Sequence, residues 1–205
     1  MAEKKKIIIN VGRQFGSGGH LVAEELGRKL GIPVYDNELI IKAAEDSGFS
    51  KDILTQSDEN RSMFNFSSFF ALSKYGPSEN YIDDNSLFKI QSDVIRQIAQ
   101  KGSAVFVGRC SDYILRDMDC CLDVFISAPL EDRKARVSER NGISLEKAED
   151  LCRKKDRTRE TYYNYFTFQN WGVASNYDLC INSSILGIEG TADMIINFAE
   201  KEGRL

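Results

Sequence analysis

The pattern of hydrophobic and polar positions changes period within residues 7–30. Apolar or β-branched residues at 7–9 and 11 form a short run that suits a buried parallel strand. From His20 onward, apolar residues recur at helical spacing, with charged residues between them. Glycines fill the interval between the two patterns. The segment therefore predicts a strand, a glycine-rich turn and a helix in direct succession.

The rest of the chain continues to alternate between strand-like and helix-like segments. A short strand is expected at 34–35, and further strands at 103–107, 122–126 and 176–182. Helices are expected at 38–44, at 83–100, after Pro129, from Ser144 to about residue 159, and at 191–200. Ser144 is the expected N-cap of its helix. We find no internal repeat.

Residues 50–85 differ in character from the rest of the sequence. They are rich in Ser, Asn and Phe, with a break at 74–80. The pattern favours a helical insert with a mobile connection, suited to covering a substrate. Its phenylalanines can be packing residues or platforms on which bases stack. Aromatic residues at such spacing are more often packing residues.

Length and composition fit one sizeable domain over residues 1–205, or one domain with a lid-like insert. The bounds expected for these parts are about 45–85 for the insert and about 138–170 for the lid. The chain has 205 residues, of which 42% are hydrophobic and 28% charged. A net charge of −4 argues against a general nucleic-acid or membrane-surface binder. No stretch has the length of a transmembrane helix, and the lysines at 4–6 run directly into a strand. A cytoplasmic protein is therefore expected, and its oligomeric state is left open.

The five cysteines are odd in number and have no C-x-x-C spacing. Disulfides and a structural zinc site are therefore not expected, and no metal ligands are assigned. Cys110 lies near a candidate site, but a small buried thiol is the simpler role for it.

The glycine-rich turn is the first candidate site. A helix that begins after such a turn directs unpaired amides and its positive dipole end into the loop, which favours a phosphate. The alternative is a tight turn without a ligand. The expected donor phosphate-binding residues are Gly16, Ser17, Gly18, Gly19 and His20.

The loop lacks two parts of the standard phosphate-binding motif G-x-x-x-x-G-K-S/T. Gly19 stands where the Lys is expected, and the following hydroxyl residue is also absent. Arg13 and His20 are the nearest cations that can supply the missing charge. The alternatives are a solvated loop arginine and a neutral surface histidine.

Further charged residues follow later strands and helices. Asp36 follows the strand at 34–35, where open α/β sheets bind ligands, although it can also simply cap the next helix. Arg109 follows the strand at 103–107 and suits bidentate phosphate binding, with a salt bridge as the alternative. The cationic run at 153–159 is either a solvated helix face or a lid that closes over phosphates.

These parts, in this order, resemble the cytidylate kinase-like branch of the nucleoside monophosphate kinases over the whole chain. The segments that carry the resemblance are RQFGSGG at 13–19, LGIPVYD at 30–36, VGR at 107–109, SAPLEDR at 127–133 and KDRTR at 155–159. The resemblance implies an α/β fold of the P-loop NTPase type in three layers, in which helices flank a parallel sheet. It also implies a helical acceptor-binding insert, an Arg-rich lid, and ATP with Mg²⁺ as the donor.

The resemblance also implies roles for individual residues. The acceptor-binding residues would be Asp36, Arg109, Asp156 and Arg159. Arg153 and Arg157 would face the transferring phosphates. Together with Arg13, the loop cation that can replace the missing Lys, they are the expected catalytic residues. Phosphoryl transfer depends on positioning and charge neutralisation, so no protein nucleophile is required.

Three hypotheses follow. The first is ATP-dependent phosphoryl transfer to a nucleoside monophosphate, cytidylate-like or otherwise, or to a related small acceptor. The second is a nucleotide-binding or sensing module that keeps the fold without transfer activity. The third is a structural protein with an empty loop, which would leave the cation cluster at 153–159 unexplained.

Overall fold

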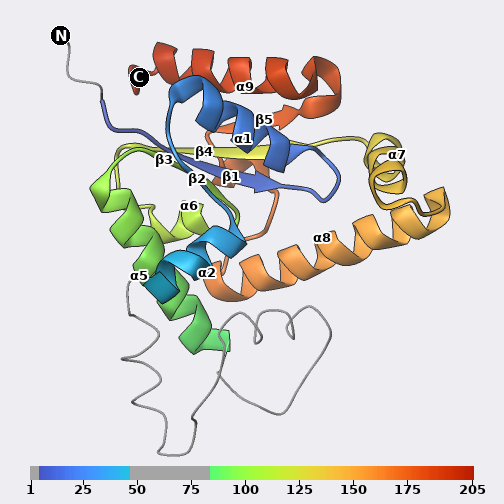
Figure 1. Ribbon diagram of the computed structural model, residues 1–205, viewed down its shortest axis with the longest axis horizontal. Coiled ribbons are helices and arrows are strands. Elements are labelled where there is room, and N and C mark those ends of the chain that lie inside the picture. The colour runs from blue at the N-terminus through green and yellow to red at the C-terminus, as the bar shows by residue number, and fades with distance from the viewer. Residues whose placement is uncertain (1–4, 47–83) are drawn as a thin grey trace, which may run out of the picture.

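The structure is a computed structural model that describes residues 5–46 and 84–205 (Figure 1). The Phe-rich insert expected at 50–85 lies outside the described residues, apart from its last two positions. Those two positions already belong to the next helix, α5.

The described residues form a parallel sheet of five strands, in the order β2-β3-β1-β4-β5. β1 lies at the centre, with β3 on one side and β4 on the other, so that Val11 aligns with Val107 and with Val124. The strands are β1 (Ile8–Arg13), β2 (Val34–Tyr35), β3 (Ala104–Val107), β4 (Cys121–Ser127) and β5 (Leu179–Asn182).

Helices cover both faces of the sheet and complete three layers (Figure 1). The two helices on one face are α1 (Gly19–Leu30) and α9 (Ser183–Lys201). The opposite face is covered by α2 (Asn37–Asp46), α5 (Asp84–Lys101), α6 (Ser111–Ile114) and the C-terminal part of α8 (Leu145–Thr167). This arrangement confirms the predicted three-layer α/β fold.

The continuous apolar run of β1 follows from this coverage. Ile9 and Val11 pack toward α1 and α9, whereas Ile8 packs toward α5, and all three side chains are buried. A parallel strand that is covered on both faces needs apolar residues at consecutive positions rather than at alternate ones.

α7 (Leu130–Asn141) and α8 form a helical hairpin that extends past the edge of the sheet (Figure 1). Val137, Ala148 and Cys152 form a small core of their own inside it. Ser144 caps α8 as predicted, because its hydroxyl accepts a hydrogen bond from the Lys147 amide at 3.3 Å.

The C-terminal elements differ from the predicted bounds. Residues 174–176 form a 3-10 turn, η1 (Ala174–Asn176), so β5 is shorter than the predicted strand. α9 begins at Ser183 rather than at residue 191, because the Asn182 side chain caps it by accepting from the Ser184 amide. A kink at Gly187, whose φ is 69°, interrupts the helical period and hides the first turns in the sequence.

All five cysteines are free. Cys110 is buried, as predicted, and burial raises the pKa of its thiol to about 12. Within the described ranges, no helix combines the length and apolar character needed to cross a membrane.

A partly buried carboxylate lies on β4 beside the central strand. Asp123 accepts a hydrogen bond from the Asn10 side chain at 2.7 Å, and its backbone amide donates to Asp178 at 2.9 Å. Burial raises the pKa of Asp123 to about 6, the charges of Asp112 and Asp178 add to the shift, and the Asn10 bond opposes it. The fold therefore favours the protonated carboxyl group.

We expect this group to make stability depend on pH. Because its pKa is higher in the folded chain than in the unfolded chain, Asp123 stabilises the fold below about pH 4 and loses that contribution as the pH rises through 6. Asp123→Asn should therefore raise the melting temperature relative to wild type at pH 7.5 more than at pH 4. Thermal unfolding across this range measures the difference. The exposed Asp119→Asn is the control, and a difference that does not vary with pH would contradict the assignment.

Candidate active site at the carboxyl edge of the sheet

Three of the predicted site residues meet at one edge of the sheet. Arg13 ends β1, Asp36 follows β2, and Arg109 follows β3 by one residue. Because the strands are parallel, their carboxyl ends share this edge, and ligands of open α/β sheets bind there. A cavity of about 340 Å³ opens beside it, lined by Arg13, Arg109, Lys155 and Arg159 on its cationic side.

The glycine-rich loop between β1 and α1 has the backbone form of an anion site. Gly16 and Gly18 have φ values of 78° and 80°, which favour glycine. The amides of Gly16, Gly18, His20 and Leu21 have no hydrogen-bond acceptor within the described part of the chain. Together with the positive end of the α1 dipole, these amides favour an anion.

Side chains of the loop have a different role from its backbone. The Ser17 hydroxyl is buried, donates to the Gln14 carbonyl at 2.9 Å and accepts from the Gly19 amide at 3.3 Å. It therefore shapes the turn. His20 is half exposed and lies 3.5 Å from Glu24, one turn along α1. The structure thus brings the backbone of the predicted donor residues together, but places the His20 ring beside Glu24.

Arg13 has no ion-pair partner among the described residues, although Asp36 is near enough to act on its charge. Its side chain fills the space that Cβ atoms would occupy at Gly19 and Gly108; a Cβ on Gly108 would lie 1.8 Å from Nη1. Its guanidinium forms no hydrogen bond or ion pair with any described residue. Burial, followed by the charges of Arg159 and Arg109, lowers the pKa of Arg13 to about 9, and Asp36 opposes the shift. The group still carries its charge at pH 7, so an anion would relieve the repulsion.

Arg109 is held in one orientation. Its Nε and Nη2 atoms donate to the Gln91 side-chain oxygen at 3.0 and 2.5 Å, and Nη2 also donates to the Tyr162 hydroxyl at 2.6 Å. Its backbone is in the left-handed region, as are those of Gly108 and Cys110 on either side. Three consecutive left-handed residues are costly and mark a backbone that its surroundings hold in place.

The other wall of the cavity is uncharged or acidic. Tyr163 donates its hydroxyl hydrogen to Asp112 at 2.7 Å, and burial raises the pKa of that carboxyl group. Trp171 and Tyr177 complete the aromatic side of the wall, and the buried side-chain oxygen of Asn37 has no partner. The cavity thus has one cationic wall and one polar, aromatic wall. A ligand with an anionic end and a polar planar part would match these two walls.

Asp36 caps α2, which is the simpler of the two roles that the sequence allows for it, helix cap or ligand contact. One carboxylate oxygen accepts from the Glu38 and Leu39 amides, both at 3.0 Å. Asp36 also lies close enough to Arg13 to raise the pKa of that guanidinium.

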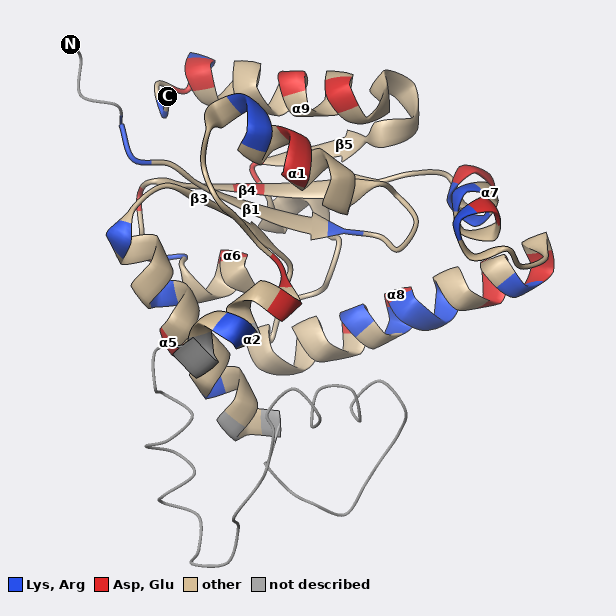
Figure 2. Cartoon of the chain, in the orientation of Figure 1, with Lys and Arg blue, Asp and Glu red and all other residues tan. Residues whose placement is uncertain are grey.

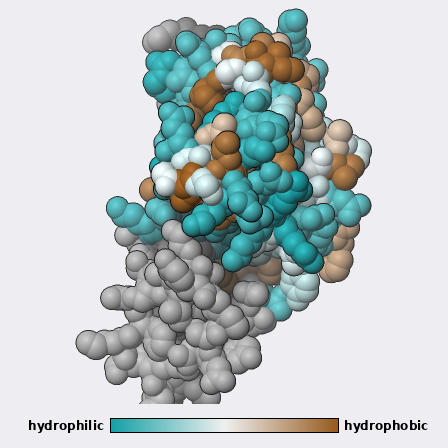
Figure 3. Space-filling model, turned by 90° about the vertical axis from the view of Figure 1, so that its right-hand side faces the viewer, coloured by the Kyte–Doolittle hydropathy of each residue, from teal (hydrophilic) through white to brown (hydrophobic). Residues whose placement is uncertain are grey.

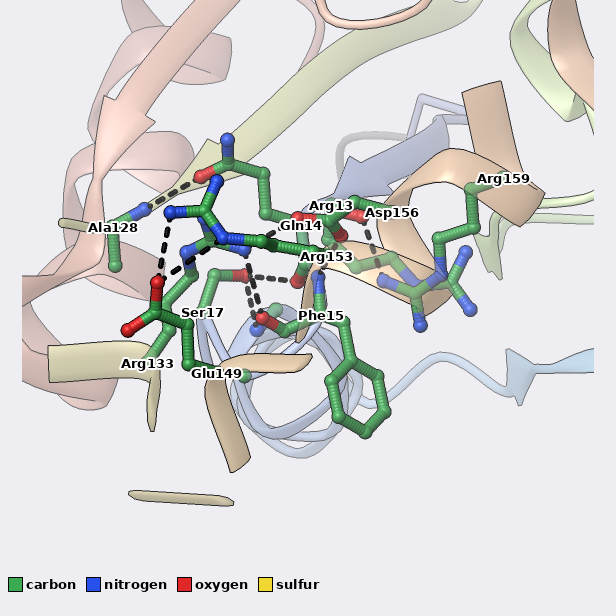
Figure 4. A network of polar contacts seen from close by, with 12 residues as sticks. Arg13, Gln14, Phe15, Ser17, Ala128, Arg133, Glu149, Arg153, Asp156 and Arg159 are labelled. Carbon is green, nitrogen blue, oxygen red and sulfur yellow. Dashed lines mark hydrogen bonds and ion pairs between the residues drawn. The ribbon is translucent and has the colours of Figure 1, made fainter. Parts of the chain in front are cut away.

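α8 brings two further predicted residues to the loop (Figure 4). The Asp156 carboxylate accepts from the Phe15 amide at 2.6 Å and pairs with Arg133. Arg159 donates to the Arg13 carbonyl at 2.9 Å. These contacts join α8 directly to the glycine-rich loop.

The remaining two arginines lie away from the cavity. Arg153 is 65% exposed and pairs with Glu149 through two nitrogens. Arg157 is exposed and lines a separate groove of about 610 Å³ with Tyr165 and Phe166. The run of Lys and Arg along α8 is visible in Figure 2. Figure 3 views the side that carries the hairpin, where hydrophilic residues cover most of the surface and hydrophobic residues form separate patches.

Sequence reasoning missed several residues of the site. The most important is Gln91, which is 1% exposed and has an unpartnered Nε2 atom. It occupies the apolar stripe of α5, one residue after Ile90 and three before Val94, so a polar residue at a core position was the available signal. Arg133, Arg136, Asp112 and Tyr162 were likewise not assigned to the site.

The residues fit an anion better than a protein-bound metal. Four free amides and an unpaired arginine are present at the loop. By contrast, residues 5–46 and 84–205 contain no group of three or more acidic, His or Cys side chains arranged to hold a metal ion.

Comparisons with known proteins agree with this geometry. The model of the cytidylate kinase-like family matches residues 8–185. The cytidylate kinase of Methanothrix thermoacetophila is 25% identical over 191 residues, which cover 93% of this chain and 96% of that protein. The cytidylate kinase of Pyrococcus horikoshii is 25% identical over 189 residues, which cover 91% and 85%.

Solved structures agree on the fold. An uncharacterized protein from Eubacterium ventriosum superposes with a TM-score of 0.74 at 30% identity, covering 95% of this chain and 99% of that one. Shikimate kinase from Acinetobacter baumannii, in complex with shikimate, has a TM-score of 0.53 at 13% identity, with 98% and 96% covered. The latter likeness concerns the fold alone, which is of the three-layer P-loop NTPase type.

Replacing Gly108 tests the place of the Arg13 side chain. Gly108→Ala and Gly142→Ala both put a Cβ on a left-handed residue, at a cost of about 1–2 kcal/mol of unfolding free energy. Only the Cβ at position 108 displaces Arg13, because nothing lies within 4 Å of position 142. We therefore expect similar stabilities in urea denaturation but weaker inorganic pyrophosphate binding for Gly108→Ala. Equal affinities in the two variants would contradict this geometry.

Proposed function

The chain belongs to the cytidylate kinase-like family, and on that premise we propose that it transfers a phosphoryl group from ATP to a nucleoside monophosphate or a related small acceptor. The observation that carries the proposal is the position of Arg13, a cation between the glycine-rich loop and the cavity that forms no ion pair with a described residue. The aliphatic part of the Arg13 side chain lies against the loop at Gly19, and its guanidinium lies beside Gly108 at the cavity.

In the proposed complex, the donor phosphates bind the loop. The free amides of Gly16, Gly18, His20 and Leu21 suit a chain of phosphate oxygens. When ATP is bound, its Mg²⁺ would neutralise phosphate charge. We assign that ion no protein ligand in the described ranges.

The acceptor is proposed to occupy the cavity. Arg109, Arg159 and Lys155 would bind its phosphate, and Gln91 and Tyr162 would keep Arg109 aimed at it. The remainder of the acceptor would lie toward Asp112 and the aromatic wall. Asp36, engaged with α2, would act on the acceptor site mainly through its charge beside Arg13.

These groups would lower the barrier by positioning and by electrostatics. Phosphoryl transfer develops charge on oxygens that lie between donor and acceptor, where a fixed cation is most effective. Arg13 would act at that point. The resemblance adds Arg153 and Arg157, which would have to turn toward the phosphates from the outer face of α8.

A nucleotide-binding or sensing module is the second candidate function. The observation that favours it is Gly19 at the position of the motif lysine, with the His20 ring beside Glu24 instead of in the loop. Such a module would bind nucleotides at the same edge of the sheet without forming a product.

A ligand panel separates these two functions. Thermal unfolding with ATP, GTP, CMP, dCMP, UMP and AMP, with and without Mg²⁺, should show stabilisation by a donor and by an acceptor. ADP formed from a stabilising pair supports the kinase. Stabilisation by a monophosphate alone, without product, supports the module, and no shift with any nucleotide would contradict both.

Arginine variants test the proposed roles. Arg13→Ala and Arg109→Ala should each lower kcat by about 10²–10³, the loss typical of one preorganised charge contact. Arg157→Ala tests the role that the resemblance gives to the outer face of α8 and should also lower kcat. The exposed Arg116→Ala is the control. Rates within twofold of wild type would remove the substituted residue from the active site.

A further inference from the structure

The phosphate-binding loop is held from outside rather than by its own side chains. Apart from Ser17, no side chain of 15–19 bonds within the loop, and its glycines have wide conformational freedom. Instead, side chains from α7, α8 and α9 donate to four carbonyls between residues 13 and 17. The bonds run from Arg159 to the carbonyl of residue 13 (2.9 Å), from Arg133 to 15 (3.2 Å), from Arg136 to 16 (3.3 Å) and from Ser183 to 17 (2.5 Å).

Asp156 is the centre of this network. One carboxylate oxygen accepts from the Phe15 amide at 2.6 Å, and the other pairs with Arg133, which in turn donates to the Phe15 carbonyl (Figure 4). Arg133 and Asp156 therefore bind both backbone groups of one loop residue. Both side chains are well shielded, with 9% and 17% exposed. Charge-assisted bonds in such a setting are strong and directional.

The Phe15 side chain adds an apolar anchor. Its ring packs on the small core of the α7–α8 hairpin, beside Val137 and Cys152. The guanidinium carbons of Arg140 and Arg159 lie 5.3 and 5.5 Å from the ring centre. The hairpin thus fixes the backbone and the side chain of the same residue.

We propose that Asp156 and Arg133 are a positioning pair that holds the phosphate-binding loop in its anion-binding form. This inference rests on the proposed function and assigns Asp156 to the donor side, whereas the resemblance assigns it to the acceptor. Both of its oxygens are already bound to the loop and to Arg133, and neither is turned to the acceptor. The pair orients the amides that follow Phe15 without touching the donor itself.

Asp156→Asn tests the pair with little change in shape. The amide has one acceptor oxygen, so it cannot serve both the Phe15 amide and Arg133. In the absence of any ligand, we expect faster amide hydrogen exchange in peptides covering 13–18, and about tenfold weaker binding of inorganic tripolyphosphate. The exposed Asp150→Asn, on the same helix, is the matched control and should match wild type in both measurements.

Steady-state kinetics separate the donor role from the acceptor role. Asp156→Asn should raise the KM for ATP, and leave the KM for the monophosphate within twofold. A raised KM for the monophosphate, with unchanged exchange in the loop, would overturn the proposal and support the acceptor role. If the wild type transfers no phosphate, the proposed function fails, but exchange and tripolyphosphate binding still decide this inference.

A second variant keeps the proposal testable if Asp156→Asn does not fold. If circular dichroism shows that Asp156→Asn is unfolded, Arg133→Lys decides, because it keeps the charge but its nitrogen ends one bond short of Nη1, the single atom that donates to both the carboxylate and the Phe15 carbonyl. Faster exchange at 13–18 with a native spectrum supports the proposal. Exchange equal to wild type overturns it.

Discussion

The repulsion among cations at the carboxyl edge of the sheet is the constraint on which the rest of the site depends. Arg13 lies at a strand end, Arg109 in a left-handed turn and Arg159 on α8, and burial lowers the pKa of Arg13 and of Arg159. Arg109 donates hydrogen bonds to two neutral side chains, those of Gln91 and Tyr162, and Arg159 donates to the backbone carbonyl of Arg13. Arg13 has neither kind of partner among the described residues, so a bound anion such as a phosphate would offset the repulsion.

Much of the fold could be predicted because it depends on local pattern. The apolar run of β1, the glycine at the end of α1 and the Ser144 cap are readable from neighbouring residues, and the structure has all three. The early start of α9 was hidden because Gly187 breaks its period. α6 escaped prediction because four residues are too few for any periodic signal.

The site was only partly predictable, for a different reason. Strand-end residues such as Arg13 and Arg109 can be identified because parallel topology brings strand ends together. Which face of a long helix turns inward cannot be read from a run of charges. Within the run at 153–159, Asp156 and Arg159 contact the loop, whereas Arg153 faces solvent. Only tertiary packing distinguishes these positions. Gln91 contacts Arg109 across 18 positions of sequence, which no local motif records.

The Phe15 anchor bears on how such a molecule can move. A lid is usually described as a segment that moves over a fixed binding site. Here the glycine-rich loop is attached to the α7–α8 hairpin, because the Phe15 side chain packs against the core of that hairpin. A displacement of the hairpin would therefore also displace the loop and bend the chain where β1 ends. The hairpin and the loop would move as one body relative to the sheet, and the part of the cavity wall that α8 supplies would move with them.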